Sequence, residues 1–379
     1  MNELNRKKLI EFAKKSALDS GGFGWLNAIG GVDQKKNLEA WINFRMTYVF
    51  ALETIAGNES AKQYLDHGLA AMRTLFKDEV DGGYFTEVSV GGIINSEKKS
   101  YEFAFALLAL SAASRGGDEI AKKELTVALK VFEKYFWDEE FGLVNESWNQ
   151  EFTTCNKYHG LNTNMHSVEA FLELYKSTAD SKWLSRATRI CEFAFSEAKK
   201  CSVGLIPEHF DEKWVLDESY NQEDPGDPFH PFGIIIGHQF EWARLALELS
   251  HALGASAPDW LTSEAEDIYK IAKQIGWNID GVPGFVYTLD FAGKPVVHMR
   301  MHWVITEAVA AAWTFFKITG TTNYSTDFEE WWSYAEQNFL DHSNGSWRHE
   351  LDATNRESAS VWDGRPDVYH AYQALVIGR

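Results

Sequence analysis

The chain has 379 residues with 36 basic and 55 acidic side chains, and its net charge of −19 argues against a nucleic-acid partner or an anionic membrane partner. Its three cysteines are an odd number without zinc-ligand spacing, which argues against a disulfide framework and against a cysteine metal site. The sequence has no run of 18 apolar residues and no apolar segment close to its start, and this pattern predicts a cytoplasmic protein.

A turn that joins glycine to an aromatic or aliphatic residue recurs along the chain, with steps of 60, 60, 62, 77 and 64 residues between successive copies. The marker glycines of the six turns are Gly22, Gly82, Gly142, Gly204, Gly281 and Gly345. Because recurrence at a near-constant period is the signature of a repeat architecture, we expect six similar units that account for the whole chain.

Each unit is predicted to contain two helices that differ in their apolar pattern. An amphipathic helix precedes the turn, as in 118–137 and 181–199, and a helix that is apolar on nearly every side follows it, as in 101–108 and 303–316. A helix without a polar face must be buried on all sides. Alternation of the two kinds predicts an all-α (α/α)6 barrel of six helical hairpins, in a single catalytic domain over residues 1–379. A linear helical solenoid is the alternative, but its units usually have only ~35–45 residues.

The longer loops all lie between an amphipathic helix and the next buried helix, so we expect them to gather at one end of the barrel. The longest, residues 204–234, is predicted to form part of a lid, and the alternation within 284–289 and 293–297 predicts a short β-hairpin. Sites on closed barrels form where such loops converge. The functional residues are therefore expected at the N-terminal starts of the buried helices.

Arginine or histidine occupies five of the six predicted helix starts. The residues found there are Trp41 and Arg45, Tyr101, Asn162 and His166, His238, His302 and Trp303, and His370. Glu or Gln follows one helical turn later in three pairs, His166 with Glu169, His238 with Glu241, and His370 with Gln373. A single histidine near a helix end is more often a packed core residue, but recurrence at matched positions favours a functional set.

Several imidazoles around an uncharged substrate suit the removal of a proton from a carbon next to a carbonyl, because imidazole exchanges protons at neutral pH. An open-chain aldose has such a carbon, C2, and a chain rich in acids and in aromatic rings also suits a small neutral sugar. The resulting enediolate needs a cationic or hydrogen-bond-donating group, for which Arg45 is the candidate. His238, backed by Glu241, is the candidate pair for opening the sugar ring.

Three other interpretations compete with this one. The His-x-x-Glu pairs also resemble carboxylate metal sites of helical bundles, but only Glu241 is expected to point inward beside a histidine, so we predict neither a metal nor a cofactor. A glycoside hydrolase needs two opposed carboxylic acids, whereas the recurring residue here is histidine. A sugar-binding protein without catalysis does not require several histidines beside a buried arginine.

Several motifs, distributed over the full chain, resemble those of the N-acylglucosamine 2-epimerase superfamily. They are Asn43–Thr47 (Asn-Phe-Arg-Met-Thr), Asn162–His166, Gly237–Leu245 with its Gly-His-x-x-Glu-Trp core, His302–Val304 with Glu307, and Gly364–His370. The Gly-His-x-x-Glu-Trp and Pro-Asp-x-Tyr-His motifs are fairly specific when they occur together. The His-Trp-Val opening at residue 302 is similar to the mannose isomerase and sulfoquinovose isomerase branch.

The resemblance implies a metal-free reaction through a cis-enediol. In it, His370 moves the C2 proton, His238 with Glu241 opens the ring or performs a second proton transfer, and Arg45 and His166 hold sugar oxygens. Substrate contacts are also expected from other polar and aromatic residues at these helix starts and motifs. These are Trp41, Asn162, Trp303, His302, Glu307, Trp362 and Asp367.

One departure from the family pattern concerns the substrate. Relatives often have Arg before the Pro-[Phe/Tyr]-Gly segment, where this chain has His230. Without that cation a sulfonated substrate is disfavoured, in agreement with the acidic net charge. We therefore expect an aldose–ketose isomerase that interconverts D-mannose and D-fructose, as a monomer or homodimer. The alternatives are a mannose 2-epimerase that gives glucose and, less favoured, an (α/α)6 glycoside hydrolase.

Overall fold

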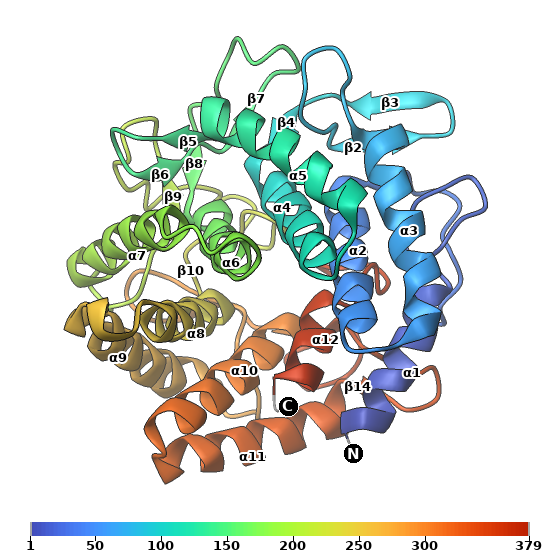
Figure 1. The fold of residues 1–379 in the computed structure, drawn as a ribbon. Helices are drawn as coiled ribbons and strands as arrows, with labels where there is room; N and C mark the ends of the chain where they lie inside the picture. Colours follow the sequence, from blue (N-terminus) through green and yellow to red (C-terminus); the bar gives the residue numbers. More distant parts are fainter. Residues whose placement is uncertain (1, 378–379) are drawn as a thin grey trace. The chain divides into compact units, whose positions relative to one another are not determined.

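The computed structural model describes residues 2–377, and within this range the chain forms twelve helices joined by loops with short strands (Figure 1). Six helices are buried on nearly every side: α2 (Ala40–Ile55), α4 (Ser100–Arg115), α6 (Leu161–Thr178), α8 (Ile236–Leu253), α10 (His302–Thr319) and α12 (Tyr369–Val376). The other six alternate with them and expose a polar face: α1 (Asn2–Lys14), α3 (Lys62–Ala71), α5 (Glu119–Val131), α7 (Lys182–Lys200), α9 (Asp259–Gly276) and α11 (Thr322–Asn338). The predicted alternation of amphipathic and buried helices is confirmed.

The boundaries of these helices follow from local chemistry. Asp118 caps α5, where its carboxylate accepts the backbone N–H groups of Ile120 and Ala121. The stretch predicted as one helix to residue 137 changes after α5 into a π-helical turn, Phe132–Phe136, and α3 ends in the same way at Met72–Phe76. Single 3₁₀ turns cover Glu59–Ala61 and Gly254–Ser256. The buried helix α10 is rich in alanine, so α8 and α11 pack closely against it.

The six marker glycines all adopt the left-handed conformation, with φ between +70° and +86°. Glycine reaches this region without the steric cost that a Cβ atom imposes, which explains its recurrence in the turn. In three repeats the marker N–H donates to the carbonyl of an aspartate four residues earlier, namely Asp78, Asp138 or Asp341. The carboxylate of each aspartate in turn accepts the backbone N–H groups two and three residues ahead. The repeated element is therefore an Asp-x-x-x-Gly turn.

Short strands precede the buried helices. Five of them end at the residue before a buried helix: β1 (Leu38–Glu39), β4 (Lys98–Lys99), β8 (His159–Gly160), β10 (Ile234–Ile235) and β13 (Arg300–Met301). The others are β2 (Glu87–Ser89), β3 (Gly92–Asn95), β5 (Trp137–Asp138), β6 (Leu143–Val144), β7 (Ser147–Trp148), β9 (His209–Phe210), β11 (Thr288–Leu289), β12 (Pro295–Val297), β14 (Leu340–Asp341), β15 (Ser346–Trp347) and β16 (Glu350–Leu351). The predicted hairpin is confirmed, because β11 pairs antiparallel with β12, and β10 also pairs with β11.

Backbone hydrogen bonds fix the start of four buried helices. In each, the first N–H donates to a carbonyl in the segment that follows the next turn of the chain. These bonds are Ala40 to Thr86 (2.9 Å), Ser100 to Glu146 (3.0 Å), Ile236 to Tyr287 (3.1 Å) and His302 to His349 (3.0 Å). Because the first turn of a helix leaves N–H groups without intrahelical partners, these bonds both satisfy a donor and position the helix start.

Buried side-chain amides fix three of the buried helices, α2, α6 and α8, to the preceding turn. Asn43 accepts the Phe23 N–H at 2.6 Å and donates to the Phe23 carbonyl at 3.1 Å. Asn164 forms the equivalent pair with Val144, and Gln239 forms it with Ile206. All three amides are fully buried, so each lost hydrogen bond would leave a polar group without water.

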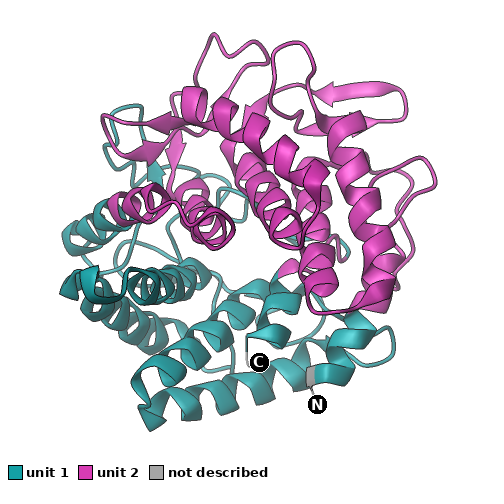
Figure 2. Ribbon diagram, in the orientation of Figure 1, with its two compact units in different colours: residues 1–9, 191–364, 370–379 teal, residues 10–190, 365–369 magenta. Residues whose placement is uncertain are grey.

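The chain divides into two compact units (Figure 2). Unit 1 comprises residues 1–9, 191–364 and 370–379, and in it α8 packs against α9 and α10, and α10 against α11. Unit 2 comprises residues 10–190 and 365–369, and in it α4 packs against α2, α5 and α6, and α2 against α3. The single domain over residues 1–379 stays a prediction.

A buried ion pair in unit 2 provides a test of this packing. The Lys98 ammonium has no solvent exposure and lies 2.9 Å from Asp78 Oδ2 and 4.0 Å from the centroid of the Phe85 ring. Asp78→Ala leaves this charge buried without its partner and also removes the carboxylate that accepts the Val80 and Asp81 N–H groups in the marker turn. We expect the free energy of unfolding to fall by about 3–5 kcal/mol in urea titrations.

The control for this variant is Asp66→Ala, which removes an exposed i, i+4 pair with Lys62 and should cost less than about 1 kcal/mol. Equal losses for the two variants would contradict the role given to Asp78.

Candidate active site

Arg45, in the second turn of α2, is buried among aromatic rings of unit 2. The centre of its guanidinium lies 4.3 Å from the ring centroid of Phe105, 5.0 Å from that of Tyr369 and 5.2 Å from that of Trp41. Its Nη2 donates to the Tyr101 hydroxyl at 2.6 Å. Aromatic faces attract a guanidinium and exclude water from it, so the orientation of the Arg45 side chain is fixed.

Asp367 supplies the carboxylate partner of Arg45. Its Oδ2 lies 3.3 Å from Arg45 Nη1, and its Oδ1 accepts the Tyr369 backbone N–H at the start of α12. Both side chains are at least nine-tenths buried. Asp367 was predicted to contact substrate, and within unit 2 the structure gives it the additional task of orienting Arg45.

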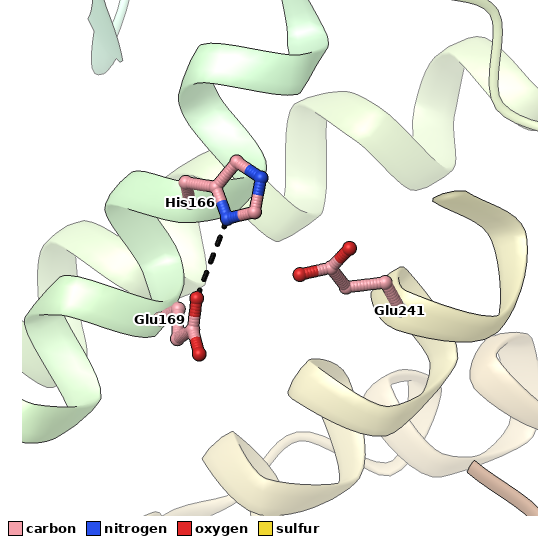
Figure 3. Close-up of side chains that lie close together, drawn as sticks. All are labelled: His166, Glu169 and Glu241. Atoms are coloured by element: carbon pink, nitrogen blue, oxygen red, sulfur yellow. Dashed lines mark hydrogen bonds and ion pairs between the residues drawn. The ribbon is translucent and has the colours of Figure 1, made fainter. Parts of the chain in front are cut away.

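His166 forms the predicted pair with Glu169 on α6. Its Nδ1 lies 3.3 Å from Glu169 Oε2, and a dashed line marks this contact in Figure 3. The Tyr369 hydroxyl donates to the same carboxylate oxygen. Because a carboxylate only accepts hydrogen bonds, a neutral His166 carries its proton on Nδ1 and its lone pair on Nε2. Asn162, one turn before His166, has a buried Oδ1 with no hydrogen-bond partner among the described residues.

Three carboxyl groups near the helix starts of unit 2 have raised pKa values; Glu102 and Glu146 are buried, and Glu39 is partly buried. Burial, together with repulsion between neighbouring carboxylates, raises the pKa of Glu39, Glu102 and Glu146 to about 7 in each case, although Lys99 opposes the shift. Glu146 accepts hydrogen bonds from Thr163 Oγ1 at 3.1 Å and from the Gly160 N–H at 3.2 Å. This group of carboxylates was not predicted from the sequence.

In unit 1, His238 is oriented by Glu208 and not by Glu241. His238 Nδ1 lies 2.7 Å from Glu208 Oε1, and Glu208 is only 2% exposed. The predicted partner, Glu241 (drawn on α8 in Figure 3), has its Oε1 3.7 Å from Arg244 Nη2. One turn along a helix places two side chains on the same face but does not make them meet, which is why the predicted pairing was wrong.

His370 is oriented by Glu307. Its Nδ1 lies 2.9 Å from Glu307 Oε1. The other oxygen of the Glu307 carboxylate, Oε2, accepts hydrogen bonds from Arg244 Nε at 3.1 Å and from Arg244 Nη2 at 3.0 Å. Glu307 was predicted to contact substrate, and the structure places its carboxylate between Arg244 and His370.

Trp303 lies beside both of these histidines. Its ring centroid is 5.1 Å from that of His238 and 5.8 Å from that of His370. His302 stacks on His349 with ring centroids 3.8 Å apart and an interplanar angle of 18°, and its centroid is 6.3 Å from that of His370. Unit 1 thus contains a group of aromatic and imidazole rings in which His238 and His370 each contact a separate buried carboxylate.

The sequence contains a signal that identifies Glu208 and His349. Both lie four residues after a marker glycine, as do Thr86 and Glu146. The carbonyls of Thr86, Glu146 and His349 accept the first N–H of a buried helix, so this position lies beside a helix start. A polar residue at marker plus four is therefore a candidate site residue in this repeat.

Trp362 belongs to a loop that Glu350 organises. The Glu350 carboxylate accepts backbone N–H groups of Ser360, Val361 and Trp362 and the hydroxyls of Ser358 and Ser360. Burial opposes ionisation of Glu350, but these hydrogen bonds outweigh it and lower its pKa. The Trp362 ring centroid lies 5.4 Å from that of Phe229, which belongs to the predicted lid.

The predicted lid itself carries Glu208, and its later residues contact the segment around that carboxylate. His209 Nε2 lies 2.8 Å from the Pro231 carbonyl, and the Tyr220 ring stacks on His209 with centroids 4.6 Å apart. His230, at the position where relatives often have Arg, accepts a hydrogen bond from Asn221 Nδ2 through its backbone carbonyl. The later residues of the lid loop thus contact the residue next to the carboxylate that orients His238.

The family model of N-acylglucosamine 2-epimerase (GlcNAc 2-epimerase) matches residues 21–374. The chain belongs to this family. It is 40% identical over 370 residues to a D-mannose isomerase of Thermobifida fusca, and the match covers 97% of this chain and 91% of that protein. A crystal structure of D-mannose isomerase superposes with a TM-score of 0.93 and 26% identity, over 100% of this chain and 96% of that one.

A more distant structure, cellobiose 2-epimerase from Spirochaeta thermophila DSM 6192, superposes with a TM-score of 0.86 at 18% identity over 98% of this chain and 92% of that one. The structural neighbours include (α/α)6-barrel epimerases and isomerases, so the predicted fold class of this family member is confirmed. No helix within residues 2–377 is both long and apolar enough to cross a bilayer.

The raised pKa of Glu146 predicts a pH-dependent stability. The folded protein keeps the proton on Glu146 up to about pH 7, whereas the unfolded chain releases it near the ordinary value of 4.5. Stability from the protonated form is therefore present at low pH and is lost as pH rises from about 4.5 to 7. Glu146→Gln should remove this loss and gain up to about 3 kcal/mol relative to wild type between pH 5 and pH 8.

Urea titrations at the two pH values measure this difference. A neutral amide still accepts the Gly160 N–H and donates to Thr163, so folding should be retained. The control, Glu151→Gln, alters an exposed carboxylate of the same loop and should leave the pH dependence of wild type. Parallel pH profiles for wild type and Glu146→Gln would contradict the shifted ionisation.

Proposed function

We propose that this family member is an aldose–ketose isomerase that interconverts D-mannose and D-fructose by proton transfer between C2 and C1 through a cis-enediolate. One observation carries the proposal. In unit 1, His238 and His370 are each bonded through Nδ1 to a separate buried carboxylate, beside the ring of Trp303. The choice of mannose as the substrate rests on the similarity to D-mannose isomerases.

His370 is the proposed base. With Nδ1 donating to Glu307, the lone pair of a neutral imidazole is on Nε2, which takes the C2 proton and returns it to C1. Glu307 fixes the tautomer and the ring orientation and stabilises the imidazolium that forms. A base with these properties works near neutral pH because imidazole both accepts and releases protons there.

His238 is the proposed acid–base group for ring opening and for proton transfer to the sugar oxygens. Glu208 performs for it the orienting task that Glu307 performs for His370. Glu241 stays in the proposal as a catalytic carboxylate, but its partner in unit 1 is Arg244. Trp303 offers an apolar ring face on which the C–H face of a sugar stacks.

The roles proposed for unit 2 follow the family resemblance. Arg45 stabilises the enediolate oxygen, because its fixed charge and N–H donors favour an anion over the neutral sugar. His166 binds a sugar hydroxyl through Nε2, and Asn162 does so through the Oδ1 that lacks a partner among the described residues. Further substrate contacts are proposed for Trp41, His302, Trp362 and Asp367.

A mannose 2-epimerase is the second candidate. It uses the same enediolate but returns the proton to the opposite face of C2, which requires a second proton carrier. The separately oriented His238 meets that requirement. A glycoside hydrolase is less favoured, because in unit 1 Glu208 and Glu307 are bonded to imidazoles and orient them.

We also propose that the chain works as one catalytic domain, since the family model extends over both units. A neutral monosaccharide is the proposed partner, in a cytoplasmic monomer or homodimer without a required metal or cofactor. The acidic net charge supports a neutral substrate over a phosphorylated or sulfonated one.

Incubation of D-mannose with the enzyme in D2O, followed by NMR, tests the reaction. We expect fructose that carries deuterium at C1, at a rate unchanged by EDTA. Glucose with deuterium at C2 would support the epimerase instead. Loss of turnover in EDTA with recovery on metal addition would overturn the metal-free proposal, and His370→Asn should abolish C2 exchange because it removes the base.

Replacement of Glu208 tests the orientation of His238. Glu208→Gln keeps the size of the side chain but removes the charge that holds the imidazole, and we expect kcat to fall by about 100-fold with little change in KM. Isomerisation kinetics on mannose measure the effect. Glu329→Gln, on the exposed face of α11, is the matched control and should behave as wild type. A Glu208→Gln enzyme within threefold of wild type would remove Glu208 from the mechanism.

A further inference from the structure

Arg244 lies on α8, two turns after its start, and is 2% exposed. Its guanidinium faces three carboxylates of unit 1. Nε and Nη2 lie 3.1 and 3.0 Å from Glu307 Oε2, Nη2 lies 3.7 Å from Glu241 Oε1, and Nη1 lies 3.1 Å from Glu248 Oε1. Glu241 and Glu307 are at most 1% exposed, so water contributes little to their stabilisation.

Two of these carboxylates form a group with the proposed base. One ligand atom from each of Glu241, Glu307 and His370 lies within 4.8 Å of the other two, which is the spacing of side chains that share a metal ion. Such a group of two buried carboxylates and one imidazole requires a positive charge. Arg244 provides that charge from the protein itself, at hydrogen-bonding distance from Glu307.

We propose that Arg244 is a positioning residue that replaces a metal ion in this group and thereby keeps His370 available as a base. The inference rests on the proposed function in one respect, namely the choice of His370 as the group that removes the C2 proton. It goes beyond that function because it assigns a task to a residue that acts on His370 through the Glu307 carboxylate.

The charge count explains why one unit of positive charge is suitable. With both carboxylates ionised, Arg244 leaves one excess negative charge when His370 is neutral and none after His370 has taken a proton. The group therefore favours the protonated state that His370 reaches during the reaction. Without Arg244, two uncompensated buried carboxylates would hold His370 in the protonated form, and a protonated imidazole cannot accept a proton.

The geometry explains why the charge is carried by arginine. Two N–H groups of the guanidinium donate to one oxygen of Glu307, which leaves the other oxygen directed at His370 Nδ1. A divalent metal in the same place would bind an imidazole nitrogen of His370 and so compete with its proton. Lysine would keep the charge but lacks the paired, planar donors.

The test compares Arg244→Ala, Arg244→Met and Arg244→Lys by NMR exchange of the mannose C2 proton in D2O. We expect the Ala and Met variants to lose on the order of 100-fold in exchange rate, and Lys to lose less. Added guanidinium chloride at millimolar concentration should restore at least tenfold in Arg244→Ala, which has a vacated space, and nothing in Arg244→Met, which fills it. Arg356→Ala removes a 79% exposed arginine and should exchange as wild type.

A second measurement does not depend on turnover. Titration with Co2+, followed by visible absorption and calorimetry, should show a site in Arg244→Ala that binds at least tenfold more tightly than wild type. The double variant Arg244→Ala/His370→Ala should lose that gain. If Arg244→Ala does not fold, Arg244→Lys and Arg244→Met still decide the exchange comparison.

Three results would overturn the inference: Arg244→Met exchange within threefold of wild type, a folded Arg244→Ala that guanidinium does not restore, or a folded Arg244→Ala without increased Co2+ binding. A wild-type protein that is inactive on mannose would overturn the proposed function alone. In that case, Co2+ binding gained by Arg244→Ala would still support the placement of the charge.

Discussion

The starts of four buried helices depend on a hydrogen bond to another repeat of the chain. The first N–H of α2, α4, α8 or α10 donates to a carbonyl in the segment after the next turn, and a short strand brings the chain into that position. Catalytic groups must be held to within a fraction of an ångström, and loops alone do not provide this. Here Arg45, His238 and His302 stand on helices whose first turns are fixed by backbone bonds, while the segments that accept those bonds also carry Glu146 and His349.

The two oriented histidines of unit 1 differ in the charge around their carboxylates. Glu208 bonds to His238, whereas Glu307 shares its charge between His370 and Arg244. Chemically similar pairs in different surroundings are how one protein obtains an acid and a base from the same residue type. The same asymmetry suits an isomerase, in which one group moves a proton between carbons while another serves the oxygens.

The family kinship joins isomerases and epimerases on one scaffold, and the chemistry explains how this is possible. Both reactions begin with removal of the C2 proton and pass through an enediolate, so the machinery for the difficult step is common. The outcome depends on which atom and which face receives the proton. That choice requires changes of about an ångström in the position of a sugar relative to an imidazole, which a helical scaffold accommodates without a change of fold.

The sequence by itself determined the repeat, the alternation of buried and amphipathic helices, and the placement of Arg45, His166, His238 and His370 at helix starts. These features depend on the local periodicity of apolar residues and on glycine's access to positive φ, both of which are visible in the chain. Only the tertiary structure decided the partners of those residues, such as Glu208 for His238 and Glu307 with Arg244 for His370. Spacing along one helix shows which side chains share a face, but contacts between elements 30 or more residues apart depend on how the helices pack and on the direction of each side chain.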